Sequence, residues 1–340
     1  MAARYRSALS AVCSRTPLAR GCRRNPRSDQ PINGYPSIET WRRRDVRILI
    51  TGAGGFIGRH LTARLVDRHE VFALVRHQGV VGLPEGARIL VHDLTSPLDK
   101  SQLPTQVDVV IHLAQSSHYR SFPEFAQDIV AVNIQSTARM LDYARLCGAK
   151  TFILASTGGV YPRSDMHVTE AAPLEAPDGF YDRTKYIAEL LAHGYEEVLR
   201  VVVLRFFCVY GPGQKDRLVP GILERIRSNQ EVVIDGSPGL RLNPIYVEDA
   251  VRAFEPAFEL GLSATFNIAG DEDVTIDEMA RLLAGAVNQR LRLRHTGGKG
   301  SHALLGDNTK MKQVLGITPQ VDLRTGLQRL VSASEAKRIG

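Results

Sequence analysis

The chain has 340 residues, 44% of them hydrophobic, which is enough for two units or for one large α/β unit with an appended lobe. Its net charge of +7 arises in residues 1–44, which contain ten arginines, no lysine and two acidic residues, whereas the remaining 296 residues sum to −1. A nearly neutral body gives no reason to expect nucleic acid as a partner. No apolar run approaches the length that crosses a bilayer, so no membrane partner is expected either.

The cysteine pattern excludes two further classes of protein. The four cysteines, Cys13, Cys22, Cys147 and Cys208, share no spacing typical of a metal site or of a disulfide framework. We therefore expect neither a metal cluster nor a stapled secreted fold. Free thiols are typical of a reducing compartment, so we expect a cytoplasmic protein.

Residues 1–44 are rich in Arg, Ser, Pro and Gly and show no sustained hydrophobic periodicity. We interpret this segment as a disordered basic extension, or as sequence upstream of a later start codon. The alternative is a targeting peptide, because such peptides are also rich in Arg and poor in acidic residues.

The first ordered stretch, ILITGAGGFIG at 48–58, indicates an apolar strand, a tight turn and the start of a helix. Gly52 allows the tight turn, Gly55 leaves room for a pyrophosphate near the backbone, and Gly58 lets the helix pack closely on the strand. The positive N-terminal end of that helix then faces the phosphates. This context favours a dinucleotide site, with a plain structural turn as the alternative.

Further along the chain, strands and helices are expected to alternate. Apolar runs predict strands at 70–76, 88–92, 107–113, 151–155, 201–207 and 265–269, with a short one at 232–234. Helices are predicted at 56–67, 124–147 and 180–193, within 214–242, and in a terminal helical lobe from 277 to about 335. This alternation favours a doubly wound parallel sheet, whose ligands bind beyond the carboxyl ends of its strands.

Tyr181 and Lys185 stand four residues apart in a predicted helix and therefore share one face. A free tyrosine has a pKa near ~10, and a nearby ammonium together with a nicotinamide ring would lower it toward the working pH. Alone this spacing is weak, and a solvated Lys beside a half-buried Tyr is the alternative. Ser156 and Thr157 strengthen it, because they follow a predicted strand and offer a hydroxyl to a substrate oxygen.

With these motifs in this order, the sequence resembles the extended short-chain dehydrogenase/reductases, in their NAD-dependent epimerase/dehydratase branch. The resemblance runs from about residue 46 to 335. It rests on TGAGGFIG (51–58), HDL (92–94), HLAQ (112–115), NIQST (133–137), FILASTGGVYP (152–162), YDRTK (181–185), LRFFCVYGPG (204–213), RLNPIYVEDA (241–250), FNIAG (266–270) and DNTKMKQVLG (307–316). It implies a Rossmann NAD(P)-binding domain at 45–210 and 243–270, and a smaller C-terminal α/β substrate lobe at 211–242 and 271–340.

The resemblance also implies roles for individual residues. Thr157 and Tyr181 would contact the sugar hydroxyl or ketone, while Lys185 would bond the nicotinamide ribose and tune Tyr181. The implied cofactor contacts, besides Tyr181 and Lys185, are Gly52, Gly55, Phe56, Ile57, Gly58, Arg76, Asp93, Leu94, Leu113, Ala114, Gln115 and Phe207. Among them, Asp93 would bond the adenine amino group, residues 113–115 would pass the adenosine ribose, and residues 206–207 would run beside the nicotinamide.

Three residues are implied as substrate contacts. Asn133 resembles a buried polar residue near the substrate, and its equal alternative is a core Asn that bonds backbone. Arg241 resembles a residue that clamps a nucleotide phosphate, with an exposed loop Arg as the alternative. Cys208 stands where related epimerases typically carry an Asn that faces the substrate diphosphate, which weakens any inference about the substrate.

Two further departures bear on the activity. Many relatives end the second strand with an Asp that accepts the ribose hydroxyls of NAD, whereas this chain has Arg76 there. Because Arg76 would pair with a 2′-phosphate, NADP is favoured over NAD, unless Arg76 only stacks on adenine. Gly158 and Gly159 follow Thr157 where 4,6-dehydratases usually have acidic residues, which argues against a dehydratase.

These features predict an NAD(P)-dependent sugar-nucleotide epimerase that acts by transient hydride transfer and takes a nucleotide sugar as substrate. The alternatives are an NADPH-dependent reductase of a keto-sugar nucleotide and a non-catalytic, nucleotide-sensing Rossmann protein. The sequence leaves open the sugar, the nucleotide and the oligomeric state, with a homodimer among the alternatives.

Overall fold

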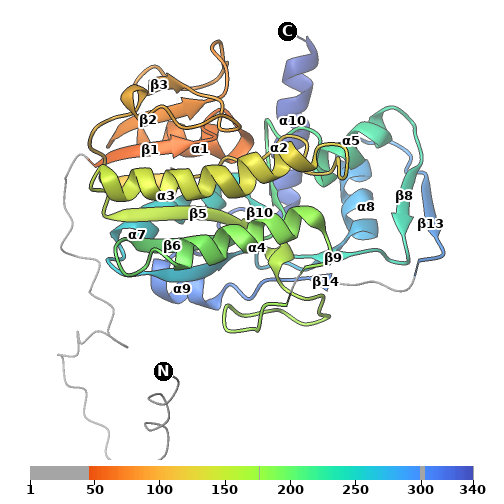
Figure 1. The fold of residues 1–340 in the computed structure, drawn as a ribbon. Coiled ribbons are helices and arrows are strands. Elements are labelled where there is room, and N and C mark those ends of the chain that lie inside the picture. The colour runs from red at the N-terminus through yellow and green to blue at the C-terminus, as the bar shows by residue number, and fades with distance from the viewer. Residues whose placement is uncertain (1–45, 176, 299–302, 340) are drawn as a thin grey trace, which may run out of the picture. The chain divides into compact units, whose positions relative to one another are not determined.

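The computed structural model describes residues 46–175, 177–298 and 303–339. The predictions for residues 1–44 therefore lie outside the described residues. At the centre is a seven-stranded parallel sheet, in the order β11-β6-β5-β4-β1-β2-β3 (Figure 1). Its strands are β1 (Arg47–Thr51), β2 (Glu70–Val75), β3 (Arg88–Val91), β4 (Val109–His112), β5 (Thr151–Thr157), β6 (Arg200–Phe206) and β11 (Ala264–Ile268). The predicted doubly wound sheet is confirmed, and its strand order reverses between β1 and β4.

Apart from the edge strand β3, which is largely exposed, the strands of the sheet are buried on both faces, which explains their nearly continuous apolar runs. Ile48 and Ile50 pack with α1 (Phe56–Leu65), α6 (Val247–Arg252) and α7 (Phe254–Glu259) on one face. Leu49 packs with α3 (Ser136–Leu146) and α4 (Phe180–His193) on the other face, where both helices cross the sheet (Figure 1). The two cores hold the carboxyl ends of the strands at a common edge.

A third core belongs to the C-terminal half. It is formed by α5 (Leu218–Arg227), α8 (Ile276–Ala286) and α10 (Leu323–Ile339), together with β8 (Val232–Asp235). Short strands complete this part: β7 (Val209–Tyr210) with β10 (Ile245–Tyr246), β9 (Arg241–Leu242) between β12 (Val274–Thr275) and β14 (Ala303–Leu304), and β13 (Leu293–Thr296) beside β8. The terminal segment thus contains strands as well as the predicted helices.

Helix α9 (Thr309–Leu315) differs from the predicted domain division. Met311 and Leu315 are buried in the same core as Ile48 and Ile50, on the face of the sheet that carries α1. Lys310 donates to the backbone oxygen of Thr265 in β11 at 2.9 Å. This segment therefore packs on the sheet and not in the substrate lobe, because its apolar face matches the space beside the edge strand β11.

The helix predicted at 124–147 is interrupted. It consists of α2 (Ala126–Val130), a π-helical turn at Ala131–Gln135 and α3. A π turn changes the register of the side chains by one residue without a proline or glycine to mark it, so the sequence pattern does not reveal it. The turn contains Asn133, whose side chain is consequently turned toward the core.

Two candidate features are absent from the described part of the chain. No helix there is both long and apolar enough to span a membrane. No group of three or more His, Cys, Asp and Glu side chains is arranged there to hold a metal ion. Cys147 and Cys208 are free thiols.

Candidate active site

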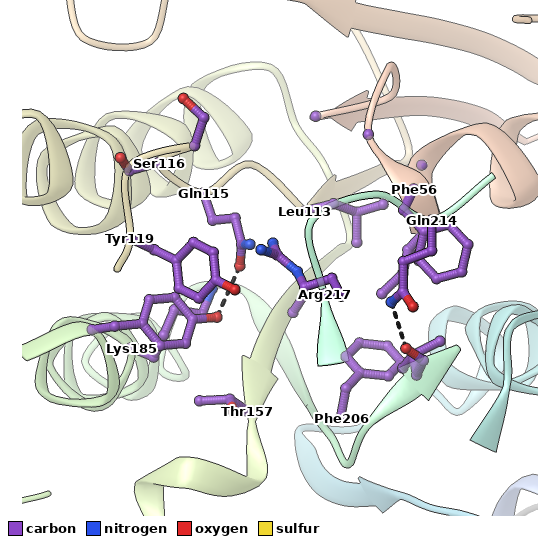
Figure 2. Close-up of a pocket in the computed structure, with 18 of the residues that line it drawn as sticks. Phe56, Leu113, Gln115, Ser116, Tyr119, Thr157, Lys185, Phe206, Gln214 and Arg217 are labelled. Atoms are coloured by element: carbon purple, nitrogen blue, oxygen red, sulfur yellow. Dashed lines mark hydrogen bonds between the residues drawn. The ribbon is translucent and has the colours of Figure 1, made fainter. Parts of the chain in front are cut away.

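A cavity of about 500 Å³ opens at the carboxyl edge of the sheet, at the point where the strand order reverses (Figure 2). Parallel α/β sheets bind ligands at this position. Its lining residues come from the glycine turn and the start of α1, the ends of three strands, the loop after β4, α4, and the segment from β6 to the start of α5: Gly52, Gly55, Phe56, Ile57, Gly58, Leu113, Gln115, Ser116, Ser117, Tyr119, Arg120, Ala155, Ser156, Thr157, Tyr181, Lys185, Phe206, Cys208, Val209, Gln214, Arg217, Leu218 and Val219. This lining contains three cationic side chains and no acidic one, so the cavity suits an anionic ligand.

The glycine turn fits the pyrophosphate of a dinucleotide. Gly52 has φ +67°, and a Cβ atom on Gly58 would lie 2.3 Å from the Gly52 oxygen, so neither position accepts a side chain without distortion. Gly55 caps α1 with extended backbone, and no side chain bonds the first turn of the helix. The free backbone N–H groups of Phe56 and its neighbours therefore face the cavity without an acidic residue beside them.

Helix α4 begins and ends where the sequence predicts, and it brings Tyr181 and Lys185 to the cavity. The Tyr181 hydroxyl donates a hydrogen bond to Oε1 of Gln115 at 2.8 Å. Burial raises the pKa of Tyr181, and the Asp182 carboxylate raises it further, whereas Arg217 lowers it. The predicted lowering of this pKa requires a nicotinamide ring as well as Lys185; among the protein groups alone, desolvation of the phenol dominates.

Lys185 is 3% exposed and lines the cavity. Burial lowers its pKa to about 8, although the Glu189 carboxylate one turn later acts in the opposite direction. In the described part of the chain, no hydrogen bond joins the Lys185 ammonium to another residue. Its ammonium is therefore not engaged by a protein acceptor, and the contact with the nicotinamide ribose stays a prediction.

The two hydroxyl groups at the end of β5 also reach the cavity. Thr157 is the last residue of the strand, and its Oγ1 accepts a hydrogen bond from the backbone N–H of Gly159 at 3.1 Å. Ser156 is buried, and its Oγ has no partner in the described structure. Because buried polar groups are normally hydrogen-bonded, an unpaired hydroxyl in a cavity is suited to bond a polar ligand.

The predicted adenine end lies outside this cavity. Arg76 and Asp93 follow β2 and β3, and Arg76 Nε lies 3.4 Å from Asp93 Oδ2. Burial acts to raise the pKa of Asp93, but hydrogen bonds from Thr95 and the Arg76 charge outweigh it and hold the pKa low. Leu94 is 8% exposed and packs in the core with Leu49, so its side chain is structural.

Other predicted contacts are placed differently. Phe206, not Phe207, lines the cavity, because neighbouring residues at the end of a strand point to opposite faces. Phe207 is fully buried beside Tyr161. Ala114 is absent from the lining, and it lies against the backbone of Gly52, where a Cβ atom would come within 2.9 Å.

Asn133 is also absent from the lining. It is 1% exposed; its Oδ1 accepts from the backbone N–H of Ser116 at 2.9 Å, and its Nδ2 donates to Thr184 Oγ1 at 2.8 Å. These bonds match the alternative of a core Asn that bonds backbone. Asn133 thus fixes the loop after β4 to the first turns of α4.

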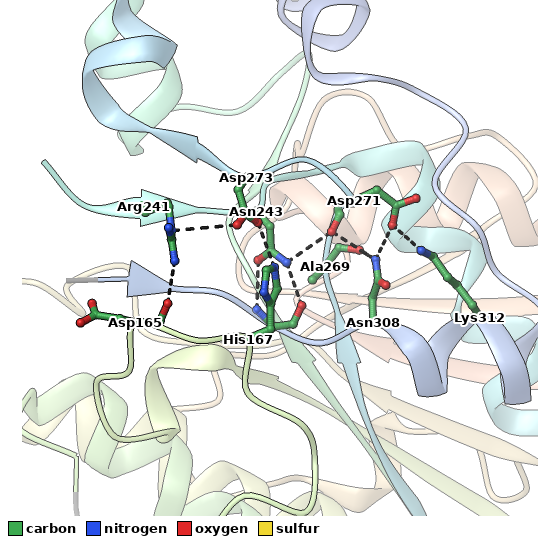
Figure 3. Close-up of polar contacts among 11 residues, drawn as sticks. Asp165, His167, Arg241, Asn243, Ala269, Asp271, Asp273, Asn308 and Lys312 are labelled. Carbon is green, nitrogen blue, oxygen red and sulfur yellow. Dashed lines mark hydrogen bonds and ion pairs between the residues drawn. The ribbon is translucent and has the colours of Figure 1, made fainter. Parts of the chain in front are cut away.

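Arg241 belongs to a polar network away from the cavity lining (Figure 3). Its Nη2 donates to the backbone oxygen of Asp165 at 2.6 Å, and its Nε lies 3.9 Å from Asp273 Oδ2. His167 pairs with the same Asp273 carboxylate at 2.9 Å. The guanidinium is therefore held by protein groups, and the phosphate contact of Arg241 stays a prediction.

Cys208 lines the cavity in an unusual backbone conformation. Its φ is +43°, in the left-handed region that Asn tolerates better than Cys. Burial raises the pKa of the thiol to about 12, so it is uncharged at neutral pH. The position thus provides neither a charge nor an amide.

Besides Ser116 and Ser117, the sequence interpretation missed four polar lining residues, Tyr119, Arg120, Gln214 and Arg217. The Arg217 guanidinium carbon lies 4.1 Å from the centre of the Tyr119 ring, and Figure 2 shows Gln115, Tyr119 and Arg217 turned toward one another. All four lie in irregular segments that follow β4 or precede α5. The sequence could have indicated these residues by their position after strand ends, because the loops there line the ligand site of parallel α/β sheets.

Comparisons with known proteins find relatives over most of the chain. The family profile described as "NAD dependent epimerase/dehydratase family" matches residues 48–269. A curated relative from Bacillus subtilis (strain 168), described as the uncharacterized UDP-glucose epimerase YtcB, is 29% identical over 306 residues, covering 83% of this chain and 96% of the relative. The dTDP-4-dehydro-6-deoxy-D-allose reductase of Streptomyces bikiniensis is 29% identical over 317 residues, covering 86% and 96%.

A solved structure shares the fold over nearly its whole length. It is the UDP-glucuronic acid 4-epimerase from Bacillus cereus in complex with UDP-glucuronic acid and NAD, with a TM-score of 0.78 and 26% sequence identity. The match covers 86% of this chain and 99% of that structure. Proteins of similar sequence and fold thus include both epimerases and a reductase.

Proposed function

The chain belongs to the NAD dependent epimerase/dehydratase family and is an enzyme of the extended short-chain dehydrogenase/reductase type, and from this premise we propose that it is an NAD(P)-dependent sugar-nucleotide epimerase. The observation that supports the proposal most directly is that Thr157, Tyr181 and Lys185 line one cavity with the glycine turn. These groups come from β5, α4 and the β1–α1 turn, and they meet only in the folded chain.

In this proposal each group has a separate role. A nicotinamide held by the glycine turn and Lys185 would supply the hydride chemistry, reversible transfer to and from one sugar carbon. Tyr181 takes the proton from the sugar hydroxyl and gives it back, and the Thr157 hydroxyl binds the same sugar oxygen. Lys185 bonds the nicotinamide ribose and favours the phenolate of Tyr181 through its charge.

The protein groups around Tyr181 favour the protonated form of its phenol. Burial raises the pKa of Tyr181 although Arg217 acts in the opposite direction, so a further positive charge is needed to favour the phenolate. The oxidised nicotinamide ring carries such a charge. Loading of the cofactor would therefore prepare Tyr181 to act as a base, and the three cationic side chains would balance the phosphates.

The proposal is tested by incubating the purified protein with a panel of UDP- and dTDP-linked sugars and analysing the products by mass and by NMR. An epimer of unchanged mass is the expected product. A product two mass units heavier that forms only with added NADPH would instead identify a reductase.

The reductase is the second candidate, because two features of the chain favour it. Arg76 stands at the end of β2, where it would accept a 2′-phosphate, and NADPH is the usual source of hydride for reductions. Cys208 departs from the Asn that is typical of epimerases. One reductase of similar length is 29% identical to the chain, as is the relative described as an epimerase.

A further inference from the structure

Gln115 connects the loop after β4 to the phenol of Tyr181. The Tyr181 hydroxyl donates to Gln115 Oε1 at 2.8 Å, across a sequence separation of 66 residues. Both side chains line the cavity, so the bond crosses the space in which a substrate oxygen would meet Tyr181. The resemblance to known enzymes implied a different role for Gln115, beside the adenosine ribose.

The loop that carries Gln115 is held firmly in place. The next residue, Ser116, is 1% exposed, and its backbone N–H donates to Asn133 Oδ1 at 2.9 Å. Asn133 in turn donates to Thr184 Oγ1, and Thr184 donates to the backbone oxygen of Tyr181 at 2.7 Å. Gln115 is therefore positioned relative to Tyr181 by a chain of buried hydrogen bonds and not by a flexible surface loop.

Other groups that face Tyr181 do not offer the same contact. The Tyr119 ring meets the Tyr181 ring edge-on at 5.0 Å between ring centres, from the same loop as Gln115. Asp182 and Lys185 on α4 and Arg217 before α5 bring charges to its surroundings. In the described part of the chain, the Gln115 oxygen is the one acceptor with which the Tyr181 hydroxyl forms a hydrogen bond.

An acceptor for the phenol proton has a defined chemical effect. A hydrogen bond to the neutral form of an acid favours that form, so the Gln115 oxygen opposes ionisation of Tyr181. A substrate oxygen that is to exchange a proton with Tyr181 must first replace this amide. We propose that Gln115 is a positioning residue that holds the Tyr181 hydroxyl in the cavity through its side-chain oxygen until a substrate oxygen takes its place. This inference rests on the proposed role of Tyr181.

The test measures Tyr181 itself in the full-length protein, without substrate or cofactor. Difluorotyrosine is placed at position 181, because ring fluorination acidifies the phenol and brings its titration into a pH range that the fold survives. Its phenolate absorbance is then followed against pH in three backgrounds: native, Gln115→Met and Gln135→Met. Gln135 is the matched control, since it is exposed on the π turn and bonds only Arg139.

The expected result is that Gln115→Met moves this titration to lower pH by roughly half a unit to one unit, the effect of losing one hydrogen bond to the neutral phenol. Gln135→Met should leave it unchanged. An unchanged titration in Gln115→Met would overturn the proposal, as would an equal shift in Gln135→Met. An upward shift would also overturn it, because it would mean that the amide N–H stabilises the phenolate.

A second variant keeps the test decisive if Gln115→Met does not fold. Gln115→Glu retains an acceptor of equal length and adds a negative charge, so the phenol titration should move to higher pH. A titration that stays in place would contradict the contact. Because no turnover is required, these results stand even if the proposed epimerase activity fails its own test.

Discussion

Arg205 of β6 and Glu189 of α4 form a buried ion pair, with Nη2 and Oε2 at 2.7 Å and the side chains 4% and 1% exposed. Glu189 lies one turn after Lys185, so the pair ties the helix that carries Tyr181 and Lys185 to the central sheet. Arg205 Nη1 also donates to the Tyr161 hydroxyl at 2.6 Å. Each charge is thus satisfied where water is excluded, and neither partner can be removed without leaving the other exposed to an apolar environment.

We expect Glu189→Met to lower the free energy of unfolding by about 3–5 kcal/mol, because it leaves the Arg205 guanidinium buried and unpaired. Urea unfolding followed by circular dichroism measures this loss. The control is Glu231→Met, which removes an ion pair to Arg294 whose side chains are 39% and 54% exposed and which should cost less than about 1 kcal/mol. Equal losses in the two variants would show that the buried pair has no special role.

Tyr181→Phe keeps the ring and removes the hydroxyl, so turnover should fall by roughly 10²–10⁴-fold, the range typical of a general acid or base. Cofactor affinity should hardly change. Lys185→Met should reduce both turnover and cofactor affinity, because Lys185 is proposed to bond the ribose as well. Tyr143→Phe is the matched control, since its hydroxyl donates to the backbone oxygen of Pro104, far from the cavity lining. Near-full activity in Tyr181→Phe would refute the proposed mechanism.

Lys185 should also make the stability of the fold depend on pH. Its pKa is lowered by burial to about 8 in the folded chain, from 10.5 in the unfolded one. Between these values the unfolded state binds more protons, so the free energy of unfolding should rise with pH, by at most about 1.4 kcal/mol per pH unit. Urea unfolding of the native protein and of Lys185→Met across this window isolates the effect. Parallel pH profiles for the two proteins would contradict the lowered pKa.

The sequence predicts the parts of this fold whose chemistry is local. The bounds of α4 follow from its amphipathic pattern, and the glycine turn follows from residues that accept no Cβ atom, such as Gly58. Apart from the largely exposed edge strand β3, the strands of the sheet follow from apolar runs buried on both faces. Tyr181, Lys185 and Thr157 reach one cavity because strand ends and the helix after them meet at one edge.

Features that depend on distant contacts escape such an interpretation. Whether Phe206 or Phe207 faces the cavity depends on the exact register of β6, because a shift of one residue turns each side chain to the opposite face. Arg241 bonds a backbone oxygen 76 residues away, a partner that no spacing indicates. Arg217 and Tyr119 meet from two irregular segments, and their contact exists only once the third core has placed α5 beside the sheet.

Arg76 should decide the choice of cofactor. Its ion pair with Asp93 is half-exposed, with side chains 46% and 39% accessible, so it is weak enough to open for a 2′-phosphate. We therefore expect NADP(H) to bind more tightly than NAD(H), and Arg76→Asp to reverse that order by repelling the phosphate. Titration of both cofactors into both proteins measures this. Arg88→Asp at the exposed pair with Glu70 serves as the charge-matched control. Equal affinities throughout would show that Arg76 does not recognise the 2′-phosphate.

The difference between an epimerase and a reductase lies in the fate of the cofactor. An epimerase returns the hydride to the substrate, so its cofactor ends each cycle unchanged and is best retained. A reductase consumes one NADPH per turnover and must release the oxidised form. Arg76 and Cys208 favour the reductase. We rank the epimerase first because the other family motifs named above resemble those of epimerases, and they are more numerous than these two departures.

The fate of the cofactor can be measured directly. Freshly purified protein is denatured and its supernatant assayed for nicotinamide, and the active substrate is then run with none added. For an epimerase we expect retained cofactor and many turnovers without addition, because Lys185 and the glycine turn would hold the cofactor through each cycle. Denatured protein that releases no nicotinamide, paired with stoichiometric consumption of added NADPH, would establish the reductase instead, since only net reduction of the substrate consumes the hydride.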